Sequence, residues 1–149
     1  DRSVQPARET RPEERQRAIR RLRSAGLAVI LRVSPTYPVG LAPPGAAAPQ
    51  TEADMEAVAA FAADVGAEKI VHTPAKVVRP KHGPMHPRMA AMLAVYRRLA
   101  PRGALPFRGG SWRLSREQAE RYVVQPLRAI CRARQVPLAF CMDHLLATR

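Results

Sequence analysis

The sequence predicts an α/β fold organised around a parallel β-sheet, and three of its features indicate this. Amphipathic helical segments alternate with short apolar segments along the 149 residues. The apolar segments are nearly continuous in hydrophobic residues, as are parallel strands covered on both faces. The first two of them stop at a proline. Because 46% of the residues are hydrophobic, the chain can bury one core, and we expect a single domain over residues 1–149.

The first helix follows a leading loop over residues 1–9. Thr10 is the expected N-cap, with Glu13 at N3 of a capping box and Pro12 in the first turn, where its missing N–H has no cost. One apolar stripe of this helix is expected to pack on the core while arginines occupy the other faces. The stripe recurs at i, i+4 and i+7 and consists of Ala18, Leu22 and Ala25.

The first strand is expected over residues 27–34, between Gly26 at the C′ position of the helix and Pro35. Within this strand Arg32 and Ser34 are the polar residues. A guanidinium inside an apolar strand needs a paired charge or an anionic ligand, because its desolvation is otherwise costly. Arg32 is therefore a candidate for ligand contact.

The rest of the chain continues the alternation of helix and strand. Thr51 and Asp54 form a second N-cap signal, Ser115 and Gln118 a third, and Pro126 is expected to kink the last helix. The expected elements are a loop over 34–50, a helix over 51–66, a strand over 67–73, a loop over 75–87, a helix over 87–100, a glycine-containing segment over 101–115, a helix over 115–134 and a strand over 136–142.

Basic and aromatic side chains gather in two of these connecting segments. In the first, the loop over 75–87, they could contact an anion, although a solvated basic loop explains most of them equally well. In the second, paired glycines allow a close backbone approach, and the alternative is a glycine turn anchored by a half-buried tryptophan. The candidate substrate or nucleic-acid contacts are Lys76, Arg79, Arg108, Trp112 and Arg113.

Metal and cysteine chemistry is not indicated. His82 and His86 are four residues apart, but Gly83 and Pro84 between them oppose a helical two-histidine site, so we expect no metal ligands. Neither cysteine belongs to a C-x-x-C motif. The cluster Cys141, Asp143 and His144 is a weak candidate for nucleophilic chemistry, because neighbours on a strand point to opposite faces.

The charge and hydropathy of the chain limit its setting. The net charge is +13, carried by 22 arginines and 3 lysines, which permits contact with DNA but also fits GC-rich codon usage. Without a disulfide pattern, a signal peptide or an apolar run of about 20 residues, we expect a cytoplasmic protein without membrane contact. The chain starts at Asp1 without a methionine, which suggests an excised piece.

Three strands and four helices are too few to close a (β/α) barrel and leave a parallel edge exposed. The simplest explanation is a partial (β/α) TIM-type barrel, the C-terminal part of a larger one. Residues 10–100 would form barrel units and residues 101–149 a C-terminal extension. The expected partner is the first half of the same barrel.

Four segments carry a resemblance to a known family. They resemble the later barrel units of radical S-adenosylmethionine enzymes, in the branch similar to spore photoproduct lyase and DNA repair photolyase. Together they span nearly the whole chain. The segments are QPARETRPEERQRAIRRLRSAGLAVILRVSP (5–35), EKIVHTPAKV (68–77), FRGGSWRLS (107–115) and AFCMDHL (139–145).

The resemblance implies a [4Fe–4S] cluster and reductive cleavage of S-adenosylmethionine to a 5′-deoxyadenosyl radical that abstracts hydrogen, with DNA as a candidate substrate. It implies that Arg32 and Ser34 line the cofactor side and that His72 and Thr73 face the adenine or the substrate. The family's C-x-x-x-C-x-x-C motif does not occur here, so the cluster ligands would lie N-terminal to Asp1. No catalytic residue is assigned.

Three alternatives stay open. The chain could be a basic nucleic-acid-binding module, or a piece that completes a split barrel without catalysis of its own. An aldolase-like barrel is the third, but no strand-end lysine with carboxylate partners argues for a Schiff base.

Overall fold

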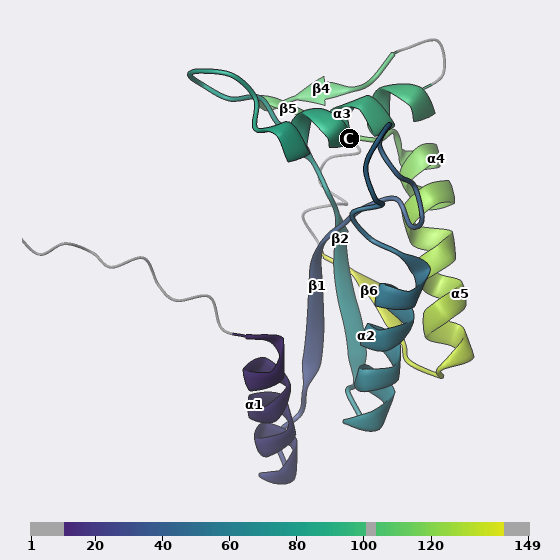
Figure 1. Cartoon of the computed structure of the whole chain (residues 1–149). Helices are drawn as coiled ribbons and strands as arrows, with labels where there is room; N and C mark the ends of the chain where they lie inside the picture. Colours follow the sequence, from purple (N-terminus) through teal and green to yellow (C-terminus); the bar gives the residue numbers. More distant parts are fainter. Residues whose placement is uncertain (1–10, 101–103, 142–149) are drawn as a thin grey trace, which may run out of the picture.

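A computed structural model describes residues 11–100 and 104–141 and shows a mixed α/β fold (Figure 1). Its helices and strands are α1 (Pro12–Ser24), β1 (Ile30–Thr36), α2 (Glu52–Asp64), β2 (Lys69–Pro74), β3 (Val77–Val78), α3 (Pro87–Leu99), β4 (Phe107–Arg108), β5 (Ser111–Trp112), α4 (Arg116–Ala119), the π-helical turn η2 (Glu120–Val124), α5 (Gln125–Ala133) and β6 (Leu138–Phe140).

Two sheets organise these elements. The first has the order β1-β2-β6 with all neighbours parallel, as the alternation of helix and strand predicts. The second is a small antiparallel sheet with the order β3-β5-β4. Figure 1 shows this small sheet and α3 at the end of the molecule where β1 and β2 finish. Neither β3 nor the β4–β5 hairpin was predicted as strand.

In the described part of the chain, helices cover one face of the parallel sheet. Ile70 is fully buried on that face, in a core with residues of α2 and α5 such as Met55 and Leu127. The other face is bare, since Ile30 is 49% exposed and Arg32 next to it is exposed as well. The expectation that the first strand is covered on both faces is therefore wrong for the residues described. The strand also extends beyond its predicted end, to Thr36.

The predicted apolar stripe of α1 does not pack, because no residue of this helix is buried. Arginines attach the helix instead. The guanidinium of Arg20 forms an ion pair with Asp64 and lies 5.2 Å from the ring centroid of Phe61. Arg23 Nε donates to the carbonyl of Val65 at 3.2 Å, at the C-terminus of α2, where the helix dipole favours a cation.

The two ends of α1 differ in how well they match the prediction. At the C-terminus Gly26 has φ +80° and donates to the carbonyl of Arg23, as expected of a C′ glycine. At the N-terminus Arg11 occupies the N-cap position, and Glu14 accepts its backbone N–H at 3.2 Å in place of Glu13. Thr10 lies outside the described residues.

The other two helix starts are confirmed. Thr51 caps α2, and its side chain accepts the N–H of Asp54, whose carboxylate accepts hydrogen bonds from the Thr51 hydroxyl and N–H. These bonds lower the pKa of Asp54. Ser115 and Gln118 form the equivalent capping box of α4.

Pro126 disturbs the last helix at the expected place. Because proline has no N–H, the carbonyl of Tyr122 four residues earlier loses its helical donor. The helix widens to a π-turn over Glu120–Val124, and Val39 from the loop after β1 donates its N–H to Tyr122 at 3.0 Å. The disturbed helix thus binds the loop that follows the first strand.

The β4–β5 hairpin depends on its two glycines. Gly109 and Gly110 have φ of +54° and +71°, the positive values that a two-residue type I′ turn requires at both central positions. The turn allows Phe107 to pair with Trp112, and their ring centroids lie 4.9 Å apart. The expected glycine turn with a half-buried tryptophan is confirmed.

A second core lies beneath this small sheet. It joins α3, β3 and η2 through buried residues such as Val77, Tyr96 and Val123. The Tyr96 hydroxyl donates to the carbonyl of Ala75 at 2.9 Å, and burial raises the pKa of this phenol. Among the described helices, none combines the length and the hydropathy needed to cross a membrane.

The end of α5 yields a stability prediction. Gln135 holds φ +57° at the C′ position, where a side chain costs energy and glycine does not. We expect Gln135→Gly to raise the free energy of unfolding by about 0.5–1 kcal/mol in urea denaturation. The matched control is Gln125→Gly, at an exposed helical position with φ −62°. It should lower that free energy by about the same amount. Two losses of equal size would contradict the argument.

Candidate functional site

Arg32 extends from the edge strand β1 over the bare face of the sheet. The register pairs Arg32 with Val71 and Val71 with Ala139, so the three side chains share this face across the sheet. The guanidinium reaches past Val71, and its Nη2 lies 3.8 Å from Sγ of Cys141. No carboxylate of the described residues pairs with Arg32. The same face also carries Lys69, which pairs with Ile30, so it presents two basic side chains beside exposed apolar surface.

His72 lies on the opposite face of the sheet. It alternates with Val71 along β2, is fully buried, and has its ring centroid 4.7 Å from that of Phe140. Its Nδ1 is 3.1 Å from Oγ1 of Thr36, which donates its one proton to the carbonyl of Thr73 at 3.0 Å. The hydroxyl must therefore accept from His72, which places a proton on Nδ1.

The four predicted cofactor contacts consequently do not share one face. Arg32 and Ser34 are exposed on the bare face, and Thr73 follows the alternation of Val71 onto that face. His72 instead lies on the face that the helices cover, where it forms a hydrogen-bond cluster with the Thr36 hydroxyl and the carbonyl of Thr73. A register shift between Val33 and Thr36 follows Arg32, so the end of β1 carries one extra residue beside β2.

Thr36 and Gln50 were missed as site residues. Gln50 is buried, and its Oε1 accepts the N–H of Tyr37 at 2.9 Å while its carbonyl accepts the N–H of Gly40 at 2.9 Å. It therefore closes the proline-rich loop after β1. Its Nε2 and Oγ1 of Thr73 are buried and have no hydrogen-bond partner among the described residues. The sequence signal that could have indicated Gln50 is its place directly before Thr51, the N-cap of α2.

The predicted substrate contacts gather around the small sheet. We call this the hairpin surface; strand alternation places its aromatic pair, Phe107 and Trp112, on one face of the small sheet and Arg108 and Val78 on the other. Phe107 is 45% exposed beside the half-buried Trp112. The backbone N–H of Arg79 donates to the carbonyl of Gly110 at 2.8 Å, which holds the loop after β3 against the hairpin. The residues of the hairpin surface are Lys76, Val78, Arg79, Phe107, Arg108, Trp112 and Arg113.

Within this surface the side chain of Arg113 is positioned by a local contact. Its Nε donates to Oγ of Ser111 at 3.4 Å, and that hydroxyl donates in turn to the carbonyl of Arg108 at 3.0 Å. Lys76 is exposed at the start of the loop that leads from β2 to β3. The five residues that the sequence assigned to substrate or nucleic acid thus all lie on or next to the small sheet, but Arg108 and Trp112 are on opposite faces of it.

Over residues 11–100 and 104–141 no group of three or more His, Cys, Asp or Glu could hold a metal ion. His86 caps α3, because its Nδ1 accepts the N–H of Arg88 at 3.3 Å. In the weak nucleophile cluster, Cys141 is described and contacts Arg32, whereas Asp143 and His144 lie outside the described residues.

Comparison of the chain with protein-family models, with curated proteins and with solved structures finds no match.

Two isosteric substitutions test the hydrogen-bond cluster. Thr36→Val removes the partner of His72 Nδ1 and of the Thr73 carbonyl, so we expect the free energy of unfolding to fall by about 1–3 kcal/mol. Thr73→Val removes a buried hydroxyl without a described partner and should raise that free energy by about 1 kcal/mol or more. Thermal unfolding of both variants measures the difference. Equal losses would show that the Thr73 hydroxyl has a stabilising partner.

Proposed function

We propose that this chain forms later βα units of a radical S-adenosylmethionine enzyme similar to spore photoproduct lyase. One observation carries the proposal: parallel strands in the order β1-β2-β6 have helices over one face and Arg32 on the bare face. In a (β/α) barrel the helices form the outer ring and the opposite face of the sheet points inward. The bare face would then be the inner face of the barrel.

Burial inside a barrel would change what Arg32 requires. A guanidinium removed from water needs a charged partner, and the carboxylate of S-adenosylmethionine is an anion that it could bind in a bidentate manner. Ser34 and Thr73 lie toward the carboxyl ends of β1 and β2, where barrel enzymes place their ligands. These three residues are the proposed cofactor contacts.

The cluster of the proposed enzyme is not held by this part of the chain. The described residues offer no thiolate set of the kind that binds a [4Fe–4S] cluster, and the C-x-x-x-C-x-x-C motif is absent from the 149 residues. The cluster ligands would belong to another part of the same barrel, and that part is the proposed partner.

Anaerobic reconstitution of the complete reading frame with iron and sulfide tests this proposal. We expect a C-x-x-x-C-x-x-C motif in the frame, a cluster absorbance band, and release of 5′-deoxyadenosine from S-adenosylmethionine. Arg32→Ala should weaken cofactor binding about tenfold or more, because a charge-assisted bidentate contact is lost. Arg17→Ala, an exposed arginine of α1, is the matched control. A frame without the motif, or no 5′-deoxyadenosine, would refute the proposal.

The hairpin surface favours a second candidate function, the binding of single-stranded nucleic acid. Aromatic rings stack on bases and neighbouring cations contact phosphates, and this combination does not depend on base sequence. The exposed ring of Phe107 and the basic residues on and next to the same small sheet, Arg79 among them, are the two elements that support this candidate. The net charge of +13 would add long-range attraction.

Fluorescence anisotropy with a labelled oligonucleotide tests the second candidate. Phe107→Ala is expected to weaken binding by about 1–3 kcal/mol, the value of one base stack. Arg79→Gln should reduce the slope of log K against log salt by about 0.7, as one phosphate contact is lost. Arg17→Gln on α1, at the opposite end of the molecule in Figure 1, removes the same charge as a control. Equal effects of both arginine variants would indicate unspecific attraction.

A further inference from the structure

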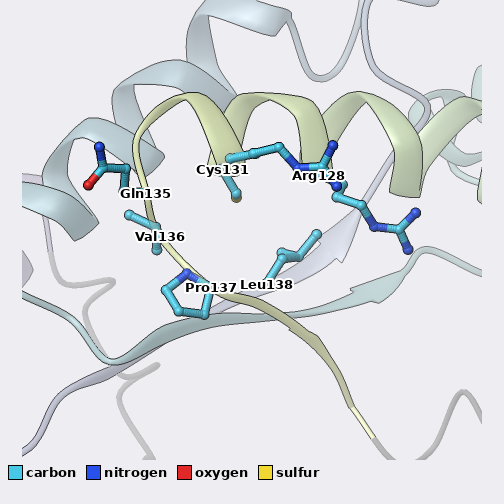
Figure 2. Close-up of a pocket in the computed structure, with 7 residues that line it drawn as sticks. Arg128, Cys131, Gln135, Val136, Pro137 and Leu138 are labelled. Carbon is cyan, nitrogen blue, oxygen red and sulfur yellow. The ribbon is translucent and has the colours of Figure 1, made fainter.

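An open cavity of about 480 Å³, with much of its mouth facing solvent, lies between α5 and the edge strand β6, on the face of the sheet that the helices cover. Figure 2 shows Cys131 pointing from the helix and Leu138 from the strand into the space between them, with Pro137 beside it. The volume is within the range of about 300–1,000 Å³ that small-molecule sites occupy. The site belongs neither to the bare face nor to the hairpin surface.

The floor of this cavity is apolar. Cys131 and Val136 are only 1% and 6% exposed, so the accessible apolar surface comes from the exposed Pro137 and the half-buried Leu138. Burial raises the pKa of the Cys131 thiol, so this group stays uncharged at neutral pH. A hydrocarbon chain or a ring can cover such a floor without removing a charged or strongly polar group of the protein from water.

Two arginines border the cavity, and they differ in charge balance. Arg128 is half-buried, and its Nη1 binds Oε1 of Glu120 at 2.8 Å, so its charge is compensated. Arg132 is exposed and makes no ion pair within the part of the chain that the structure describes. The rim therefore carries one uncompensated positive charge above an apolar floor.

We propose that this cavity binds a small monocarboxylate with an apolar tail, the tail on Pro137 and Leu138 and the carboxylate on Arg132. The single uncompensated charge favours a monoanion over a doubly charged phosphate. The planar guanidinium matches the two oxygens of a carboxylate. The site is independent of the proposed barrel, since its residues lie on the face opposite to Arg32.

Titration of the full chain with hexanoate and with 1-hexanol tests the proposal, because the two probes share a tail and differ in charge. We expect hexanoate to bind about tenfold more tightly than 1-hexanol, as a charge-assisted hydrogen bond is gained. In ¹H–¹⁵N spectra the largest shifts should fall on the amides of Gln135, Val136 and Leu138.

Arg132→Gln should bring the two affinities to within about twofold of each other, because the charge that distinguishes the probes is gone. Arg134→Gln is the matched control, since this exposed arginine at the same helix end does not line the cavity. It should keep the full preference for hexanoate. Both positions are exposed, and unchanged melting temperatures will confirm that the variants fold.

Three results would overturn the proposal. The first is equal binding of hexanoate and 1-hexanol to the unaltered chain, which would indicate an apolar crevice without anion recognition. The second is an equal loss in the Arg132 and Arg134 variants, which would indicate general surface attraction. The third is a set of amide shifts outside the α5–β6 junction.

Discussion

The helices that connect the parallel strands cover the same face of the sheet, and the other features of the chain follow from this constraint. Parallel neighbours need long crossovers, and here α2 and α5 end up packed together over Ile70 in one core. The opposite face receives no helix in the described part, so Ile30 and Arg32 remain exposed. A parallel sheet normally has both faces covered. Over the described residues the sheet therefore differs from a doubly wound one, in which helices cover both faces.

The carboxyl end of the sheet is organised by polar contacts that act over long distances in the sequence. Pro126 frees a helical carbonyl at Tyr122, and the N–H of Val39 binds it, which fixes the start of the loop after β1. Gln50 then closes that loop through Tyr37 and Gly40. An irregular turn in the last helix thus helps to position the segment that follows the first strand. In α/β proteins such segments carry binding residues.

What could be predicted from the sequence was set by local chemistry. The caps at Thr51 and Ser115 and the C′ glycine at Gly26 depend on hydrogen bonds within a few residues, and all three are present. Features that depend on distant partners were missed. Arg20 and Arg23 attach α1 to residues more than forty positions away, so a helical stripe could not reveal how that helix packs.

The candidate site residues show the same division between local signals, which the sequence contains, and distant pairings, which it does not. Strand ends and basic loops were the sequence signals for candidate residues, and the residues of the hairpin surface lie on or next to one small sheet but on its two faces. The pairing of Val77 with Trp112, which brings two loops together, joins residues far apart and has no local signal. Strand alternation alone should have separated His72 from Thr73, because adjacent residues of a strand face opposite ways.

The arginine-rich composition supports nucleic-acid binding less strongly than the net charge of +13 suggests. Arg20, Arg23 and Arg128 bind groups of the protein itself, and Arg98 donates to the carbonyl of Ala42 at 3.0 Å. Position therefore discriminates better between functions than total charge does. The hairpin surface lies at the end where the parallel strands finish, which in a barrel is the end that receives substrate (Figure 1). A nucleic acid bound there would lie at the entrance to the proposed inner face, so the two candidate functions can be parts of one.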